Sequence, residues 1–198
     1  MDKNLKKLIE DKEVLNIYIY GSQVYGIANK NSDTDYIVIT DKEKREDYKV
    51  DDIDFNFYTK DEWIDLANRN EIVFIECIFL DGKFKLKETF IPEYEIEIKK
   101  VRHEFSQKAS NSFVKCKKKL TIEKDYDPYI GKKSLFHSLR ILKFGIFLLD
   151  NGYLKYNIAN GYYKDIVLNE DNDWLYFKDK YQPEYNKLKS EFRKFDRL

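Results

Sequence analysis

Two neighbouring stretches decide the fold, IYIYGSQVYG at Ile17–Gly26 and SDTDYIVI at Ser32–Ile39. The first is a β-branched and aromatic run that stops at Gly21–Ser22, where backbone N–H groups become free to meet a phosphate. The second begins with Asp33 and Asp35 and continues as another apolar run. Residues two apart on a strand point to the same side, so these carboxylates face one way and can share divalent metal ions. The pattern indicates a nucleoside-triphosphate site.

A third strand is predicted from Ile53 to Tyr58, because apolar and polar residues alternate strictly there. The alternation places the side chains of Ile53, Phe55 and Phe57 on a buried face and those of Asp54, Asn56 and Tyr58 on a polar one. Asp52 shares the polar face, whereas Asp51 would point away.

The order Gly-Ser, short helix, Asp-x-Asp resembles the signature of the nucleotidyltransferase superfamily that includes DNA polymerase beta. More narrowly, Gly-Ser-x-x-Tyr-Gly at Gly21–Gly26 and Ser-Asp-x-Asp at Ser32–Asp35 resemble a group of bacterial and phage proteins described as predicted nucleotidyltransferases. The resemblance implies an α+β fold with a nucleotidyltransferase-type mixed β-sheet core, over residues 1–97. A helical C-terminal region, residues 98–198, would follow the core and close its cleft.

The same resemblance implies which residues do the chemistry. Asp33 and Asp35 would hold two Mg²⁺ (or Mn²⁺) ions, and a third carboxylate, Asp54 with Asp52 as the alternative, would join them. The expected activity is transfer of a nucleoside monophosphate from an NTP such as ATP to an acceptor hydroxyl, with release of pyrophosphate. The acceptor, whether protein, RNA or small molecule, is not identified by these motifs.

The remaining elements follow from local patterns. In the N-terminal half we predict helices at Asp2–Glu13 and Ser22–Ala28, the latter capped by Ser22, and strands at Val14–Tyr20 and Tyr36–Thr40. Asn29–Ser32 is predicted as a loop, and Thr59 with Glu62 forms a capping box that opens another helix. The apolar run Glu71–Leu80 is compatible with either a strand or a helix. In the C-terminal half we predict helices at Val101–Leu120, Lys132–Asp150, Ile158–Leu168 and Pro183–Phe195, with a break at Asp127–Pro128.

Several side chains allow both a structural and a functional interpretation. Tyr25 on the short helix either packs or contacts the nucleotide. Lys133, His137 and Arg140 share one stripe of the Lys132–Asp150 helix. That stripe is either a solvated face or a set of phosphate ligands, and the resemblance covers it as Lys-x-x-x-His-x-x-Arg.

Two further features are interpreted as structural. Glu76 lies in an apolar run and needs a partner, either Arg140 or another base. The basic cluster Lys115–Lys119 is interpreted as a solvated face.

Composition excludes several classes of protein. Acidic and basic side chains balance at 36 each, which argues against a chain held to nucleic acid by bulk charge alone. Cys77 and Cys116 lack metal-ligand spacing, so neither zinc nor a disulfide framework is expected. No apolar run reaches about 18 residues, and a cytoplasmic protein without a membrane partner is therefore expected. Two alternatives to the transferase are a nucleotide- or nucleic-acid-binding module without efficient transfer, and an antitoxin-like protein that modifies or masks a partner protein.

Overall fold

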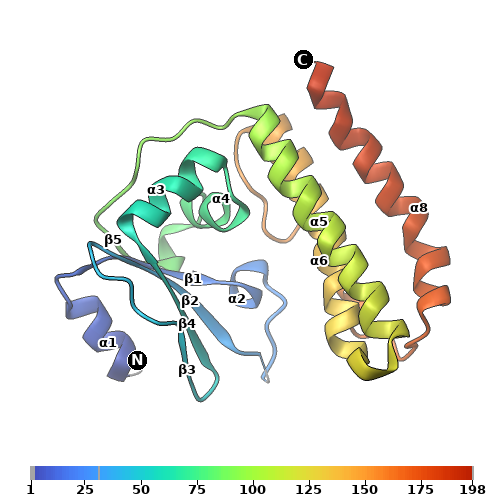
Figure 1. The fold of residues 1–198 in the computed structure, drawn as a ribbon, viewed down its shortest axis with the longest axis horizontal. Coiled ribbons are helices and arrows are strands. Elements are labelled where there is room, and N and C mark those ends of the chain that lie inside the picture. Colours follow the sequence, from blue (N-terminus) through green and yellow to red (C-terminus); the bar gives the residue numbers. More distant parts are fainter. Residues whose placement is uncertain (1–2, 31, 198) are drawn as a thin grey trace. The chain divides into compact units, whose positions relative to one another are not determined.

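A computed structural model describes residues 3–30 and 32–197 of the chain. Backbone contacts divide it into two compact units, Met1–Glu95 and Ile96–Leu198. The first unit contains a β-sheet with helices, and the second is built from helices (Figure 1). This is the predicted α+β class, with a mixed sheet followed by a helical part. The predicted division at residues 97 and 98, and the closing of a cleft by the second part, stay predictions.

The sheet has five strands in the order β3-β4-β2-β1-β5. Their bounds are Val14–Tyr20 for β1, Thr34–Thr40 for β2, Tyr48–Val50 for β3, Ile53–Thr59 for β4 and Lys85–Glu88 for β5. The central pair β2 and β4 is parallel, and the other pairs are antiparallel. The three predicted strands are present, and β2 begins two residues earlier than predicted. The sequence analysis missed β3 and β5, which are short and rich in charged residues.

One face of the sheet is covered by helix α1, Lys3–Glu10. Leu5 and Leu8 of this helix pack in a buried cluster with residues from three strands, among them Val38, Phe55 and Phe57. The alternation predicted for the third strand is therefore confirmed. The helix ends before the predicted Glu13 because the Asp11 carboxylate accepts a hydrogen bond from the Glu13 N–H at 2.9 Å, which forms a turn. The predicted first helical residue, Asp2, lies outside the described residues, as does Asn31 of the predicted loop.

The other face of the sheet carries α3, Lys60–Arg69 (Figure 1). Its start is the predicted capping box: the Glu62 N–H donates to Thr59 Oγ1 at 3.1 Å, and the Thr59 N–H donates to Glu62 Oε2 at 2.9 Å. Trp63 is buried in this helix and stacks on Tyr18 of β1 with 5.9 Å between ring centroids. Asn70 ends the helix in the left-handed conformation, with φ of 55°.

The apolar run Glu71–Leu80, which the sequence left open, forms a helix, α4, at Ile72–Ile78. Most of its side chains are buried, including those of Phe74, Ile75 and Cys77. A helix that is apolar all round has no periodicity to separate it from a buried strand. The Glu71 carboxylate accepts from the Ile72 N–H at 3.0 Å, so the charged residue serves as the helix cap.

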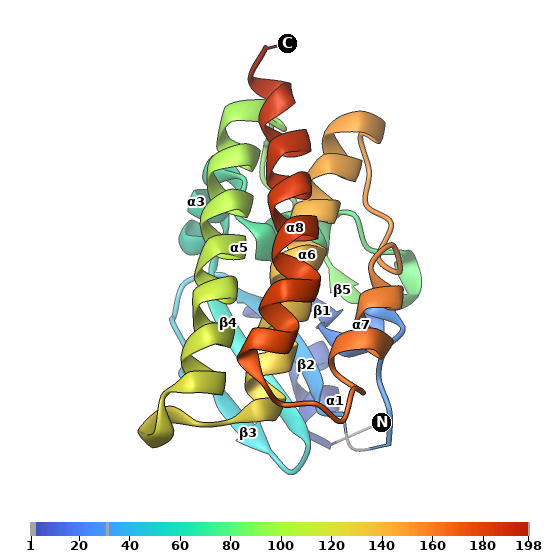
Figure 2. The same ribbon diagram turned by 90° about the vertical axis from the view of Figure 1, so that its right-hand side faces the viewer.

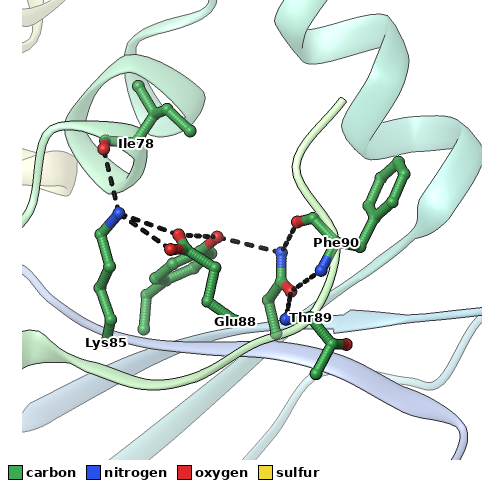
Figure 3. A network of polar contacts seen from close by, with 7 residues as sticks. Ile78, Lys85, Glu88, Thr89 and Phe90 are labelled. Carbon is green, nitrogen blue, oxygen red and sulfur yellow. Dashed lines mark hydrogen bonds and ion pairs between the residues drawn. The ribbon is translucent and has the colours of Figure 1, made fainter. Parts of the chain in front are cut away.

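Asn16 and Tyr18, neighbours on one face of β1, fasten the edge strand β5 through a polar network (Figure 3). The Asn16 amide donates to the Phe90 carbonyl at 2.6 Å and accepts from the N–H groups of Thr89 and Phe90, both at 3.0 Å. The Tyr18 hydroxyl donates to Glu88 Oε1 at 2.9 Å. Burial and this carboxylate raise the pKa of Tyr18 far above its usual value, so the hydroxyl stays protonated and can donate.

The Glu88 carboxylate is also paired with Lys85, whose ammonium lies 2.9 Å from Oε1. The same ammonium donates to the Ile78 carbonyl at the end of α4, at 3.2 Å (Figure 3). A 3-10 turn, Gly82–Phe84, connects α4 to β5. The short edge strand is therefore held by side chains on both sides as well as by its ladder with β1.

Four helices build the second unit: α5 at Ile98–Thr121, α6 at Pro128–Asn151, α7 at Asn160–Ile166 and α8 at Trp174–Arg193. Short 3-10 turns lie at Glu123–Asp125 and Lys194–Arg197. Helices α5, α6 and α8 lie side by side in Figure 2, and each contacts the other two. The predicted break is confirmed, because Asp127 caps α6 by accepting from the Ile130 N–H at 3.0 Å, with Pro128 in the first turn.

The last long helix begins nine residues earlier than predicted. The Asp173 carboxylate caps it by accepting from the N–H groups of Leu175 and Tyr176 at 3.1 and 3.3 Å. Pro183, interpreted as a helix start, lies inside α8. A proline interior to a helix removes one hydrogen bond. The apolar contacts of the buried residues Tyr181 and Tyr185 offset that loss.

Close packing joins α6 to its neighbours. Leu135, Leu139 and Leu142 of this helix are fully buried. A Cβ on Gly145 would lie 2.6 Å from the ring of Phe192, so only glycine lets α8 approach α6 at this point. Within the described residues, no helix is long and apolar enough to cross a membrane.

Candidate active site

Asp35 and Asp54 stand directly opposite one another on the parallel strands β2 and β4. Side chains of directly paired residues point to the same face of a sheet. The two carboxylates therefore lie side by side, on the face away from α1. Asp35 also pairs with Tyr20, the last residue of β1, which places the acidic pair where β1 ends and its neighbours begin. The register between the strands thus brings together two of the three carboxylates that the resemblance implied.

Asp33 lies near Asp54, because the Lys49 ammonium contacts both carboxylates. The Lys49 ammonium lies 2.6 Å from Asp33 Oδ2 and 3.2 Å from Asp54 Oδ2, so one cation serves two of the three predicted carboxylates. The hydrogen bond to Asp33 is the largest cause of the raised pKa of Lys49, which keeps the ammonium charged. Three neighbouring carboxylates were expected to need a cation, and in this structure a side chain of the chain itself supplies one.

Lys49 was not among the site residues predicted from the sequence. The residue lies on β3 and pairs with Asp54 across the β3–β4 ladder. A tight turn joins these strands, and Asp51 within it has φ of 53°. The short alternation of Tyr48, Lys49 and Val50 before the acidic turn is the only local signal for this hairpin.

Gly21 lies against Asp35, one member of the acidic pair. Its backbone has φ of 72° and ψ of −140°, a combination that is essentially restricted to glycine. A Cβ at this position would lie 2.4 Å from Asp35 Oδ2, well inside the van der Waals limit. Both observations require glycine here. They also place the backbone of the Gly-Ser turn against the Asp35 carboxylate, so the two sequence motifs meet in space.

Ser22 begins the short helix α2, Ser22–Tyr25. The prediction that Ser22 caps this helix is wrong: the capping residue is Gly21, and it makes no side-chain capping bond. The helix also ends earlier than Ala28, because Gly26 adopts the left-handed conformation and its N–H bonds to the Ser22 carbonyl. The first-turn N–H groups of Ser22 and Gln23 have no intrahelical acceptor, as in any helix start. Contact of Gly21 and Ser22 with phosphate stays a prediction.

Tyr25 is buried, and its hydroxyl donates to Glu76 Oε2 at 2.7 Å. The ring also packs edge-on against Tyr20, with 6.4 Å between centroids. Glu76 is 1% exposed and receives this hydrogen bond inside the first unit, which fits the structural role expected for it. Tyr25 thereby links α2 to α4. A direct contact of Tyr25 with nucleotide stays a prediction.

Lys133, His137 and Arg140 lie on α6, in the second unit. Arg140 is buried, with its guanidinium 4.9 Å from the centroid of the Phe144 ring, whereas Lys133 and His137 are half-buried. A stripe of this kind is not a solvated face. Desolvation, followed by the charges of Arg140 and Lys133, lowers the pKa of His137 well below its usual value. The imidazole is therefore neutral at pH 7, so any contact of His137 with a phosphate would be a hydrogen bond from a neutral ring.

The chemistry of the acidic residues suits a hard divalent cation, because carboxylate oxygens are the ligands that Mg²⁺ and Mn²⁺ prefer. Asp33 and Asp54 already converge on one positive charge, and Asp35 is directly opposite Asp54. Across residues 3–30 and 32–197, however, no three side chains of His, Cys, Asp or Glu converge as a ready-made metal cage. With the Lys49 ammonium among them, the carboxylates fit a cation by their donor chemistry and need a side-chain adjustment to share one.

Comparison with known proteins identifies the family and supports the fold. Residues 1–124 match the family of the nucleotidyltransferase domain, and the chain belongs to that family of transferase enzymes. Among solved structures, the fold is similar to that of the spectinomycin adenyltransferase AAD(9) from Enterococcus faecialis, determined with ATP and spectinomycin. The TM-score is 0.50 at 13% sequence identity, and the match covers 96% of each chain.

A second solved structure, a nucleotidyltransferase-like protein from Exiguobacterium sibiricum 255-15, matches with a TM-score of 0.36 and 12% identity. That match covers 96% of this chain and 72% of the other, and its low score adds nothing to the argument. No curated protein sequence matches the chain significantly.

Proposed function

We propose that this chain transfers a nucleoside monophosphate from an NTP to an acceptor hydroxyl and releases pyrophosphate, in a reaction that depends on Mg²⁺ or Mn²⁺. The observation that carries the proposal is the direct pairing of Asp35 with Asp54, with Gly21 in contact with Asp35. A fold of ordinary stability gains nothing by gathering like charges against a strained glycine turn. A site that must hold cations beside a phosphate needs both.

Each acidic residue has a distinct place in the proposed reaction. Asp33 and Asp35 would hold the divalent cations, which neutralise the triphosphate and activate the acceptor when they are bound. Asp54, on the neighbouring strand, is placed to complete the set and to accept the proton of the acceptor hydroxyl. Lys49 would leave Asp33 and Asp54 for this to happen. Its ammonium sits on a flexible four-carbon stem and is half-exposed, so it can swing away without disturbing the core.

The phosphates of the nucleotide would lie along the Gly21–Ser22 turn. Gly21 has no side chain that would block the phosphates. The first-turn N–H groups of α2 can donate hydrogen bonds to an anion. Lys133 and Arg140 are proposed as auxiliary ligands of the triphosphate, with His137 as a neutral hydrogen-bonding partner. ATP is the first nucleotide to test, because the similar adenyltransferase AAD(9) was determined with ATP.

The direct test is incubation with each of four NTPs labelled at the α-phosphate, with and without Mg²⁺, followed by measurement of pyrophosphate. A panel of hydroxyl-bearing acceptors, including bulk RNA, a protein extract and small polyols, should give label transfer to one class. Asp35→Asn keeps the size of the side chain and should abolish transfer. Asp65→Asn is the matched control, because Asp65 is exposed on α3. Its ion pair with Arg69, at 3.1 Å, lies on the surface and contributes little to stability.

Two results would contradict the proposal. The first is full activity in Asp35→Asn, since the paired carboxylates would then have no part in the reaction. The second is nucleotide binding by the wild-type chain with no pyrophosphate from any NTP and acceptor class, which would favour a binding module instead.

A further inference from the structure

The neutral charge of the whole chain conceals two oppositely charged halves. Counted over the two units, Met1–Glu95 contains 14 Lys and Arg against 22 Asp and Glu, a net charge of −8. Ile96–Leu198 contains 22 Lys and Arg against 14 Asp and Glu, a net charge of +8. A unit with this excess attracts polyanions at moderate salt concentration. The positions of the cations within Ile96–Leu198 are therefore more informative than the zero net charge of the whole chain.

The clearest gathering is a groove of about 430 Å³ between α5 and α8. Its lining is entirely polar or cationic: Lys99, Arg102, His103, Ser106, Gln107, Ser110, Lys189 and Arg193. Among the described residues that line it, none is acidic. Four permanent positive charges thus share a concave surface without a carboxylate on its wall.

Packing underneath holds the cations of this groove in place. The Arg102 guanidinium lies 5.7 Å from the centroid of the buried Phe192 ring. Lys189 lies over Tyr185 at 5.4 Å, and its ammonium is 3.5 Å from Ser110 Oγ. Aromatic faces fix the direction of a cation at little entropic cost. Arg102 and Lys189 are therefore held against aromatic rings of α8.

The two guanidinium groups at one end of the groove are close enough to affect one another. Burial lowers the pKa of Arg102, and the charge of Arg193 lowers it further. Positive charge is therefore concentrated at this end of the groove.

A second groove, of about 350 Å³, continues the surface along α5. It is lined by Asn111, Val114, Lys115, Lys118, Lys119 and Asp125, and the Asp125 carboxylate is paired with Lys119 at 2.5 Å. Every fourth residue of α5 belongs to one groove or the other: Lys99, His103, Gln107, Asn111, Lys115 and Lys119. At 1.5 Å per residue this row is about 30 Å long, and at 3.6 residues per turn it also winds about halfway around α5. The cluster Lys115–Lys119, interpreted from sequence as a solvated face, is the far end of this winding polar track.

We propose that this track, the α5 row with Lys189 and Arg193 of α8, binds the phosphate backbone of single-stranded nucleic acid. A repeat of cations and amides along about 30 Å matches a ligand that repeats its charge, and peptide recognition would instead need pockets for individual side chains. No aromatic side chain lines either groove among the described residues, so base stacking is absent and binding is independent of sequence. A flexible single strand can follow a row that winds around a helix, whereas a duplex, with a persistence length of about 50 nm, is too stiff to do so.

The test measures binding of a labelled 20-nucleotide oligo-U and oligo-A by fluorescence anisotropy, in EDTA and without NTP. Under these conditions the outcome does not depend on the proposed transfer reaction. Lys119 of the track is paired with Asp125, so we count Lys99, Lys115, Lys189 and Arg193 as phosphate contacts. These four contacts predict a slope of about −2.8 for log K against log salt concentration, with both sequences bound alike. The double variant K189Q/R193Q should reduce the slope to about −1.4 and weaken binding about 60-fold at 50 mM salt.

The matched control is K178Q/K187Q, which removes two exposed charges from the same helix outside both grooves. Binding by this control should remain within about threefold of wild type, since only long-range attraction is reduced. Thermal unfolding of both variants separates loss of binding from loss of fold. Equal weakening in the two double variants would overturn the proposal, because bulk charge would then explain the binding. Tighter binding of a duplex, or tripolyphosphate binding as tightly as the 20-mer, would also overturn it.

Discussion

Replacement of Gly21 by alanine tests the contact that joins the two motifs. The new methyl would lie 2.4 Å from Asp35 Oδ2, where ordinary contact begins near 3.4 Å, so the carboxylate must move by about 1 Å. The backbone at φ of 72° and ψ of −140° adds strain for any residue with a Cβ. Strain and overpacking each cost on the order of 1–3 kcal/mol, so we expect Gly21→Ala to lower the free energy of unfolding by about 3 kcal/mol.

Gly152→Ala gives the cost of a left-handed glycine without a clash, and the double-mutant cycle with Asp35 isolates the contribution of the clash. Gly152 has φ of 77° and no atom within 4 Å of the position of a Cβ, so this variant should lose only the left-handed strain, about 1 kcal/mol. Urea denaturation gives the free energy of unfolding for both variants. The double variant Gly21→Ala/Asp35→Ala removes the clashing carboxylate and should regain the overpacking part, on the order of 1–3 kcal/mol, as a coupling energy in the double-mutant cycle.

Two results would refute this reasoning. The close approach is wrong if Gly21→Ala costs no more than Gly152→Ala. It is also wrong if the two changes in the double variant are additive, because a carboxylate in contact with the new methyl must couple to it. Transfer activity is a second measurement, and we expect it to be lost in Gly21→Ala, since the displaced carboxylate no longer faces Asp54.

Three further predictions concern other parts of the chain. Lys49→Met removes the cation shared by Asp33 and Asp54, so Mn²⁺ should bind several-fold more tightly in calorimetric titrations. An unchanged affinity for Mn²⁺ would show that the ammonium does not compete with the metal. Asn16→Ala removes the side-chain partner of the Phe90 N–H and carbonyl, while the Thr89 N–H keeps its bond to the Leu15 carbonyl at 3.1 Å, so the variant should cost about 2–3 kcal/mol in urea denaturation, with faster hydrogen exchange along β5; a loss below about 1 kcal/mol would mean that the network does not hold the edge strand. The folded-state pKa of His137 is lowered, so the unfolded chain binds more protons than the folded chain near pH 6. The free energy of unfolding should therefore fall as the pH drops below about 6.5, by up to about 1.4 kcal/mol per pH unit. His137→Gln should flatten this dependence on pH, and an unchanged slope would assign it to other groups.

Local signals were sufficient wherever a few consecutive residues determine the structure. The bounds of β1 and the capping box of Thr59 with Glu62 follow from side chains that act within four residues of one another. The side-chain alternation of the third strand likewise predicted which face Asp54 would occupy. Each of these features depends on the chain's own periodicity, which the sequence displays directly.

Features created by distant partners could not be predicted in the same way. β3 and β5 are strands only because β4 and β1 offer them a ladder: β3 has three residues, and most residues of β5 are charged. The bridging position of Lys49 depends on that unpredicted hairpin. The start of α8 was missed because Pro183 was taken as a beginning, whereas the effective cap is Asp173. In these cases tertiary pairing decided between local preferences that were weak or conflicting.

The position of the acidic pair is a consequence of apolar burial. Tyr36 and Val38 of β2 and Phe55 and Phe57 of β4 all lie in the cluster beneath α1. Slipping either strand by one residue would exchange its two faces, exposing these side chains and burying a carboxylate. Each apolar side chain is worth about 1.5–3 kcal/mol when buried, whereas two exposed carboxylates about 4 Å apart repel by about 1 kcal/mol in water. Burial therefore outweighs repulsion several-fold. The register that secures the core also forces Asp54 to face the same way as its β2 partner, so the fold itself can hold the cation-binding chemistry in place before any ligand arrives.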